Sequence, residues 1–216
     1  EKDNPRYLDT KPGVKISERS EGAVMSEKDV TTFALGDMVD CFGEDFAIYR
    51  GRTKSRQPNT DLQLISRVLK VEGSRGTFTQ NPTVYTEYDV PENPWYYDQN
   101  SFATMPYSEL MEIALQPCGL LGAYLGSTLQ FPDTDLYLRN LDGDGESFDL
   151  PAGTDFRGKT IHNKSVLGSS IAHGGTILQR YTFELSIDGN VFYKGNSSFG
   201  FFTKEALDSQ VGLDKG

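Results

Sequence analysis

The stretch that decides the fold runs from Tyr107 to Leu129 and reads YSELMEIALQPCGLLGAYLGSTL. Its apolar residues fall on every side of a helical wheel, and Pro106 precedes it at a position that suits the first turn of a helix. A helix that is apolar all round is buried on every side. The stretch therefore predicts one long helix that the rest of the chain encloses.

The segments on both sides of this helix carry strand patterns. Apolar residues alternate in 77–90 and, most regularly, in 176–187, with the period of half-buried strands. Asp188-Gly189 then predicts a hairpin that returns through 191–202. Weaker strand signals lie in 63–71, 136–140, 156–161 and 165–171, and the acidic run 141–145 is interpreted as a turn. We therefore expect an α+β fold, in which a curved antiparallel sheet wraps round the helix.

The chain has 216 residues, enough for one domain with a substantial core. Residues 1–25 are polar and punctuated by proline and glycine, and we interpret them as a linker or arm. Ser26 and Asp29 then predict the start of a helix. We expect a single domain over 26–213. Because the chain has no initiator Met, we also expect it to be a piece of a longer polypeptide.

The composition excludes several classes of protein. A net charge of -10 argues against binding to nucleic acids or anionic membranes, because phosphates would be repelled. Two cysteines and two histidines argue against a disulfide scaffold and a histidine-rich metal site. No apolar run reaches the roughly 18 residues of a membrane helix, and no signal peptide is recognisable. We expect a cytoplasmic protein that holds no metal.

The few polar residues of the predicted helix are its candidates for chemistry. Glu109, Glu112 and Gln116 share one face, and the last two are spaced i and i+4. A carboxyl group in an apolar setting has a raised pKa and can act as a general acid. The alternative is that both glutamates lie in a frayed first turn, where the helix dipole favours them. Pro117 is expected to kink the helix and to free the carbonyl near Ile113.

Several motifs together resemble the hotdog-fold β-hydroxyacyl-ACP dehydratases. They are Trp95-Tyr96-Tyr97, Met105-Pro106, the pair Glu112 and Gln116, and Gln57-Pro58 with 62–68. The segments LQPCG (115–119), RNLDG (139–143) and GNSSFGFF (195–202) resemble the dehydratase region of polyunsaturated fatty acid synthases and related iterative polyketide synthases. The resemblance spans roughly 36–213 and implies a single hotdog, whose sheet wraps round one central helix.

The resemblance also implies a reaction and a site. The reaction is removal of water from a 3-hydroxyacyl chain, a lyase step of fatty acid biosynthesis, with the chain carried on the phosphopantetheine of an acyl carrier protein and no other cofactor. Glu112 would be the acid and Gln116 its hydrogen-bonding neighbour. The acyl-binding residues would be Trp95, Tyr97, Met105, Pro117 and Cys118.

The sequence departs from the family at the catalytic base. The family histidine is absent, and Asn100 stands nearest to its position, although an amide cannot act as a base. We therefore expect a second hotdog, from the same polypeptide or from a homodimer mate, to supply the histidine. The alternative is a non-catalytic pseudo-dehydratase that supports its partner and shapes the acyl tunnel. A thioesterase of the same fold is disfavoured, because the matching motifs are those of dehydratases.

Overall fold

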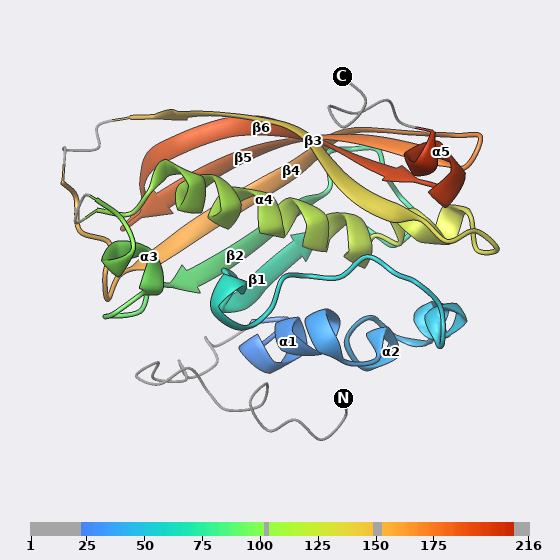
Figure 1. Cartoon of the computed structure of the whole chain (residues 1–216), viewed down its shortest axis with the longest axis horizontal. Coiled ribbons are helices and arrows are strands. Elements are labelled where there is room, and N and C mark those ends of the chain that lie inside the picture. The colour runs from blue at the N-terminus through green and yellow to red at the C-terminus, as the bar shows by residue number, and fades with distance from the viewer. Residues whose placement is uncertain (1–22, 102–103, 149–152, 210–216) are drawn as a thin grey trace.

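A computed structural model describes residues 23–101, 104–148 and 153–209. Six antiparallel strands form one curved sheet in the order β1-β2-β4-β5-β6-β3, and the helix α4 (Tyr107–Tyr124) lies against one face of it (Figure 1). The strands are β1 (Arg67–Glu72), β2 (Thr83–Asp89), β3 (Tyr137–Ser147), β4 (Thr160–His173), β5 (Thr176–Ile187) and β6 (Asn190–Phe202). This arrangement confirms the predicted α+β hotdog, a sheet wrapped round one central helix.

The central helix follows the sequence prediction closely. It starts after Pro106, is continuous through Pro117 and ends at Tyr124, with the short 3₁₀ helix η4 (Ser127–Gln130) beyond it. A proline cannot donate to the carbonyl four residues earlier, which here belongs to Ile113. The side-chain Nδ2 of Asn163, on β4, donates to that carbonyl oxygen at 3.4 Å. The hydrogen bond that the helix lacks is therefore replaced by one between the helix and the sheet.

The hairpin between β5 and β6 is the one that Asp188-Gly189 predicts. Asp188 has φ 50° and Gly189 has φ 78°, the left-handed backbone that a tight two-residue turn requires. The weaker strand signal at 165–171 lies within one long strand, β4, whereas only the last two residues of the signal at 156–161 belong to that strand. Long hairpins of this kind give every backbone group of the inner strands a partner.

The acidic run 141–145 is not the turn that we expected. These residues continue β3 to Ser147, and they pair with β6 from Asp142 opposite Ser198 to Ser147 opposite Tyr193. The ladder shifts register between Asn140 and Asp142, as at a β-bulge. Aspartate and glycine are accepted here because β3 is an edge strand whose side chains are largely exposed.

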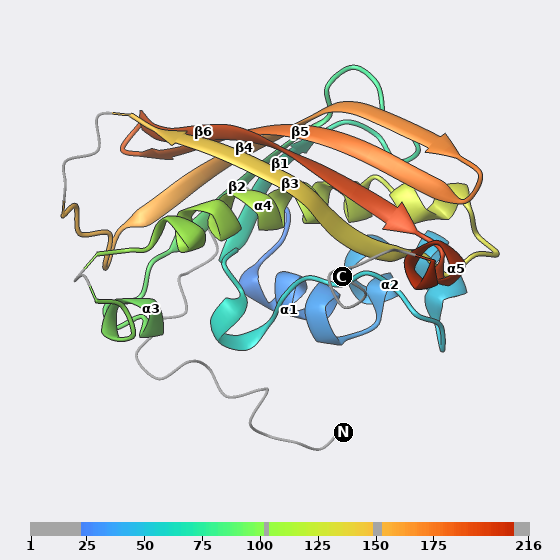
Figure 2. The ribbon, with the colours of Figure 1, turned by 45° about the horizontal axis from the view of Figure 1, so that its top comes forward.

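A layer of short helices covers the side of α4 that faces away from the sheet (Figure 2). We call residues 26–49 the cap; it contains α1 (Glu27–Leu35), α2 (Met38–Phe42) and the 3₁₀ helix η2 (Glu44–Tyr49). Ser26 and Asp29 form a capping box at the start of α1, as predicted. Residues 50–66, which we call the strap, then lead back past α4 to β1 (Figure 1).

Two large groups of buried side chains hold these layers together. One joins the cap to the second half of α4, through residues such as Phe33, Phe42, Leu121 and Leu125. The other joins the first half of α4 to the sheet and to the short helix α3 (Trp95–Asp98). The cap is therefore part of the hydrophobic core and forms one wall of any space along α4.

The two edges of the sheet differ. Met25 forms an isolated bridge with Val68 and so covers part of the β1 edge, whereas β3 has no strand on its outer side among the described residues. The short helix α5 (Lys204–Asp208) follows β6.

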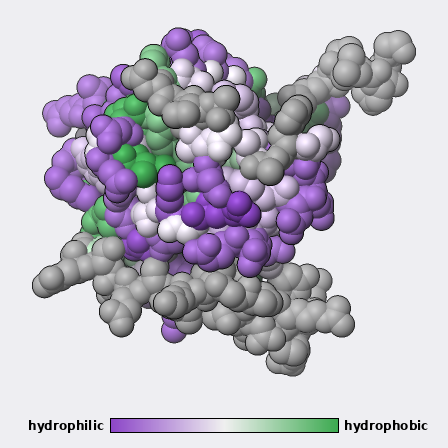
Figure 3. Space-filling view, turned by 90° about the vertical axis from the view of Figure 1, so that its left-hand side faces the viewer, coloured by the Kyte–Doolittle hydropathy of each residue, from purple (hydrophilic) through white to green (hydrophobic). Residues whose placement is uncertain are grey.

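The predicted boundary at 25/26 stays a prediction, and most of the predicted arm, 1–22, and the end of the predicted domain, 210–213, lie outside the described residues. Seen from the α3 end, the described surface is mostly hydrophilic (Figure 3).

Candidate active site

A cavity of about 220 Å³ runs beside α4, between the strap and the strands β3 and β6. Its apolar wall comes from the cap, the helix and the sheet: Phe33, Met38, Leu115, Leu138, Phe199 and Phe201. Its polar groups come mainly from the strap and from two residues of α4, Glu112 and Gln116. The predicted acid and its neighbour thus lie on a mostly apolar cavity, which is the setting in which a carboxyl group can do proton transfer.

Glu112 is held by its neighbour one turn later. The Nε2 of Gln116 donates to the Oε1 of Glu112 at 3.1 Å. Glu112 is half-buried, so its carboxyl group borders the cavity without being enclosed by protein. The predicted i and i+4 pair is therefore a direct hydrogen bond, with one carboxyl oxygen bound to Gln116.

The side-chain amide of Gln116 accepts two hydrogen bonds through its oxygen and donates two through its nitrogen. Its Oε1 accepts from the backbone N–H of Leu64 at 2.9 Å and from the Nε2 of Gln57 at 2.7 Å. Its Nε2 donates to the carbonyl oxygen of Leu62 at 2.7 Å as well as to Glu112. Because a backbone N–H can only donate, the oxygen of the amide must face Leu64. The amide therefore cannot flip, and its N–H group points at Glu112.

Gln57 is a functional candidate that the sequence reasoning missed. It is buried, lines the cavity and binds Gln116 from the strap side. Its own amide nitrogen is the donor, so it supports the same orientation of Gln116. A weak signal for it was present in the sequence, since Gln57-Pro58 belongs to one of the family-like motifs, but no role followed from that motif.

Glu109 has a different environment from Glu112, although both were expected on one face. It does not line the cavity; it is buried, with 8% of its surface exposed, and its Oε2 has no hydrogen-bond partner among the described residues. Burial, and secondarily the nearby charge of Glu112, raise the pKa of Glu109. The first-turn alternative is correct about the position of Glu109, which lies in the first turn of α4 but is buried there, whereas Glu112 lies beyond that turn and borders the cavity.

The motifs RNLDG and GNSSFGFF meet at the rim of the cavity. They lie on β3 and β6, where Asn140 pairs with Phe199. The Nδ2 of Asn140 donates to the Oγ of Ser197 at 2.8 Å, next to the register shift in β3. Asn140 and Phe199 both line the cavity. The sequence similarity in these motifs therefore corresponds to one wall of the cavity.

The other predicted site residues lie away from this cavity. Asn100 follows α3, and its Nδ2 donates to the carbonyl oxygen of Thr104 at 2.9 Å. The five predicted acyl-binding residues pack in the core or, in the case of Trp95, at its edge, and none of them lines the cavity: Trp95, Tyr97, Met105, Pro117 and Cys118. Their acyl-binding role, and that of Asn100 as the vacant base position, stay predictions.

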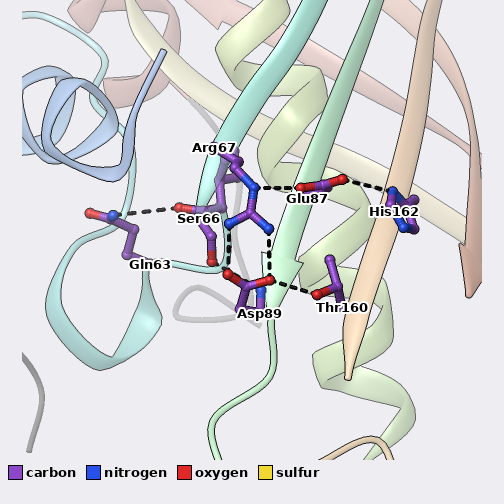
Figure 4. A network of polar contacts seen from close by, with 8 residues as sticks. Gln63, Ser66, Arg67, Glu87, Asp89, Thr160 and His162 are labelled. Atoms are coloured by element: carbon purple, nitrogen blue, oxygen red, sulfur yellow. Dashed lines mark hydrogen bonds and ion pairs between the residues drawn. The ribbon is translucent and has the colours of Figure 1, made fainter. Parts of the chain in front are cut away.

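A separate polar network lies across β1, β2 and β4 (Figure 4). Arg67 is 7% exposed and pairs with Glu87 and, at 2.6 Å, with Asp89. Thr160 donates to Asp89 at 2.7 Å, and His162 lies 3.1 Å from Glu87. None of these residues lines the cavity. Because each charged group has a partner on the next strand, we interpret the network as a cross-strand support.

Two features bear on other classes of function. Within the described ranges, no group of three or more His, Cys, Asp or Glu residues is arranged to hold a metal ion. The same part of the chain contains no helix with the length and hydropathy needed to cross a membrane.

Comparison with known proteins identifies one curated relative. A polyunsaturated fatty acid synthase subunit from Thraustochytrium sp. is 37% identical to the chain over 192 residues. The match covers 85% of this chain and 13% of that protein, so the chain spans about an eighth of the length of its relative. No protein-family model matches the chain.

Two solved structures align with the chain over most of their own length. The dehydratase heterocomplex ApeI:P from Xenorhabdus doucetiae aligns with a TM-score of 0.49 and 16% identity, over 71% of this chain and 93% of that one. A putative thioesterase, yhdA from Lactococcus lactis, aligns with a TM-score of 0.47 and 8% identity, over 68% and 99%. The sequence relationship therefore rests on the synthase subunit, and the architecture on the sheet order and the enclosed helix. The chain has the hotdog architecture, a six-stranded antiparallel sheet wrapped round one central helix, and it is related to the segment of the polyunsaturated fatty acid synthase subunit that it matches.

Proposed function

We propose that the chain supplies the acid half of a site that dehydrates 3-hydroxyacyl groups carried on an acyl carrier protein. In this reaction a base removes the proton on the α carbon, and the electron pair left behind forms the double bond to the β carbon. The bond from the β carbon to its hydroxyl breaks, and the carboxyl group of Glu112 protonates the departing oxygen, which leaves as water.

The orientation of Gln116 is the observation that carries this proposal. Its N–H group binds the Oε1 of Glu112 and leaves the other carboxyl oxygen available to a substrate hydroxyl in the cavity. The strap fixes that orientation through Leu64 and Gln57. An acid held in this way needs no rearrangement when the hydroxyl departs, which is the arrangement that efficient proton transfer requires.

The base comes from a second hotdog in this proposal. Neither His162 nor His173 lines the cavity, and Asn100, which stands nearest to the predicted position of the base, has an amide that cannot take up the proton. The outer edge of β3 is a row of backbone groups without a strand partner among the described residues, and such an edge can pair with a strand of another domain. That edge borders the cavity through Asn140 and Leu138, so a domain paired there would approach Glu112.

A supporting, non-catalytic role is the second candidate, and Asn100 favours it. Its amide is engaged with the carbonyl of Thr104, and a hotdog that has lost its base can still complete a pair. In that case the chain shapes the acyl tunnel for a site carried entirely by its partner.

The dehydration rate of the Glu112→Gln variant of the full synthase distinguishes the catalytic role from the supporting role. Glutamine keeps the size and hydrogen-bonding capacity of the side chain but cannot give up a proton to the leaving group. We expect dehydration of a 3-hydroxyacyl carrier protein to fall by about 10²-fold or more, while Glu205→Gln, an exposed change on α5, leaves the rate unaltered. A normal rate for Glu112→Gln would assign the chain to the supporting role.

A further inference from the structure

The strap begins with a basic run that stands out in this acidic chain. Residues 50–56 read RGRTKSR, four cations and no acid, whereas the chain as a whole has a net charge of -10. The first two cations are paired, Arg50 with Asp37 at 2.7 Å and Arg52 with Asp135 at 2.9 Å. The next two, at 54 and 56, line the cavity.

Within the described part of the chain, Lys54 and Arg56 bind neutral groups only. Lys54 donates to the carbonyl oxygen of Tyr49 at 3.2 Å, and Arg56 donates to the carbonyl oxygens of Phe33 and Gly36 at 3.1 and 2.9 Å. Neither forms an ion pair with a carboxylate of the described residues. Burial lowers the pKa of both groups, so their surroundings oppose the charge that they carry. A lysine has three N–H donors and an arginine five, so both retain donors for a ligand.

Ser55 adds an independent observation between these two cations. Its side chain also lines the cavity, and its Oγ is buried without a hydrogen-bond partner among the described residues. Buried hydroxyl groups nearly always have a partner, so an unpartnered one on a cavity wall points to a ligand. Three consecutive residues of the strap thus offer two positive charges and a free hydroxyl to the same space.

Lys54 lies towards the end of the cavity that is remote from Glu112. The helix residues that line the cavity extend from Glu112 to Ala123, about 16 Å along the axis. Gln57 contacts the helix near Glu112, whereas Lys54 contacts Tyr49, whose hydroxyl bonds Thr128 beyond the end of α4. The cavity therefore has the carboxyl group of Glu112 towards one end and the ammonium group of Lys54 towards the other, and Ser55 and Arg56 lie on the strap between Lys54 and Gln57.

We propose that Lys54, Ser55 and Arg56 bind the phosphate of the phosphopantetheine arm that carries the acyl group, with the arm lying along α4 and its thioester end directed towards Glu112. This inference rests on the proposed function, because it takes a carrier-bound thioester as the substrate. A phosphate offers several acceptor oxygens to an ammonium and a guanidinium group, and such charge-assisted hydrogen bonds are strong.

Measuring the affinity of the chain for two compounds, without any catalysis, tests this inference. Phosphopantetheine and pantetheine differ only in the phosphate, and their affinities for the chain are measured by calorimetry at low and high salt. We expect phosphopantetheine to bind about tenfold more tightly, with the preference weakening as salt is added. Lys54→Gln removes most of the preference, and Lys28→Gln, an exposed lysine of the cap with the same charge change, keeps it.

Ser55→Ala gives a second variant that keeps the test decisive if Lys54→Gln does not fold. The serine hydroxyl has no protein partner to lose among the described residues, so we expect wild-type stability and a preference for phosphopantetheine reduced severalfold. Equal affinity of the wild-type chain for the two compounds would overturn the inference, and so would a preference that Lys28→Gln reduces as much as Lys54→Gln does. Tighter binding of a free fatty carboxylate than of phosphopantetheine would overturn the assignment of the ligand.

Glu112→Gln separates this inference from the proposed function. That variant is expected to bind phosphopantetheine as the wild type does, because neither Lys54 nor Arg56 is paired with Glu112. If the phosphate preference is absent while Glu112→Gln still abolishes dehydration, the inference fails and the proposed function stands. If the preference is present while Glu112→Gln dehydrates normally, the proposed function fails.

Discussion

The amide of Gln116 donates to the carboxyl group of Glu112 at 3.1 Å, and the orientation of that amide is set by the backbone N–H of Leu64. The strap therefore influences the position of the Glu112 carboxyl group through a single side chain, that of Gln116. A change in the position of the strap would be transmitted to Glu112, although the two share no direct hydrogen bond.

Replacing Gln116 by leucine tests how much this link contributes to stability. The variant leaves the N–H of the buried Leu64 without its acceptor and removes the link to Gln57. We expect the free energy of unfolding to fall by about 2 kcal/mol, in urea titrations followed by circular dichroism. Gln130→Leu, which loses one hydrogen bond to Ser127 at the surface, is expected to change it by less than about 0.5 kcal/mol. Equal effects of the two changes would contradict the role given to Gln116.

Glu109 predicts a pH dependence of stability. Its pKa is raised in the folded chain above the ordinary value of 4.5, so the folded state binds the proton more tightly than the unfolded state. Stability is then full below pH 4.5 and is lost as the pH rises through the raised pKa. Glu109→Gln removes this loss, so the variant gains about 1 kcal/mol relative to wild type between pH 4 and pH 7.

Urea midpoints measured at intervals from pH 4 to pH 7 check this expectation. Glu146→Gln removes an exposed carboxyl group on β3 and serves as the control, with the same pH profile as wild type. A Glu109→Gln profile parallel to that of wild type would show that Glu109 is ionised in the folded chain at little cost.

The network around Arg67 predicts a large loss of stability on substitution. Arg67→Met leaves Glu87, which is 8% exposed, without the arginine, and Asp89 loses its two bonds from the same side chain. Removing one partner of a buried ion pair typically costs about 3 kcal/mol or more. Arg50→Met breaks an exposed pair with Asp37 and is expected to lower the unfolding temperature much less than Arg67→Met does. Thermal unfolding of both variants measures the difference, and similar shifts would contradict a buried network.

Substitution of glycine by alanine is expected to have opposite effects on stability at two positions of α4. A Cβ at Gly122 would lie 2.8 Å from the hydroxyl of Tyr181, which is buried and bonded to Gln179. At Gly119 the nearest atom would be 4.0 Å away, a Cδ of Leu138. Gly122→Ala should therefore destabilise the chain by about 1–3 kcal/mol, whereas Gly119→Ala should stabilise it by up to about 1 kcal/mol because alanine favours helix.

Chemical unfolding of the two alanine variants checks these opposite signs. Gly119→Ala also adds a methyl group to the wall of the cavity, so the same variant reports on ligand binding in that space. Destabilisation by both changes to the same extent would mean that α4 has no room on its cavity side.

The central helix and the β5–β6 hairpin were predictable because their patterns are local. An all-round apolar stretch after Pro106 and a regular alternation ending at Asp188-Gly189 each determine one kind of element. The extension of β3 through 141–145 was not predictable, because its residues favour turns and the strand is stabilised by pairing with β6, far along the chain. Sequence patterns reveal propensity, whereas this strand depends on its partner.

The sequence was enough to predict the candidate acid, Glu112, and its neighbour, but not the residues that hold them in place. Glu112 and Gln116 follow from a spacing on one helix. Gln57 contacts Gln116 across 59 positions of sequence, and the approach of the strap depends on how the cap packs on α4. The basic run in 50–56 was visible as composition, but only the structure separates the paired cations from those that line the cavity.

The bond from Asn163 to the carbonyl of Ile113 has a consequence for motion. Pro117 gives up one bond inside the helix, and the replacement ties α4 to β4 one turn away from Gln116. The same amide also donates to the carbonyl oxygen of Ala114 at 3.4 Å, so β4 holds α4 at two consecutive residues. Movement of the helix away from β4 would break both bonds, so an opening that separates the helix from the sheet is opposed near its midpoint.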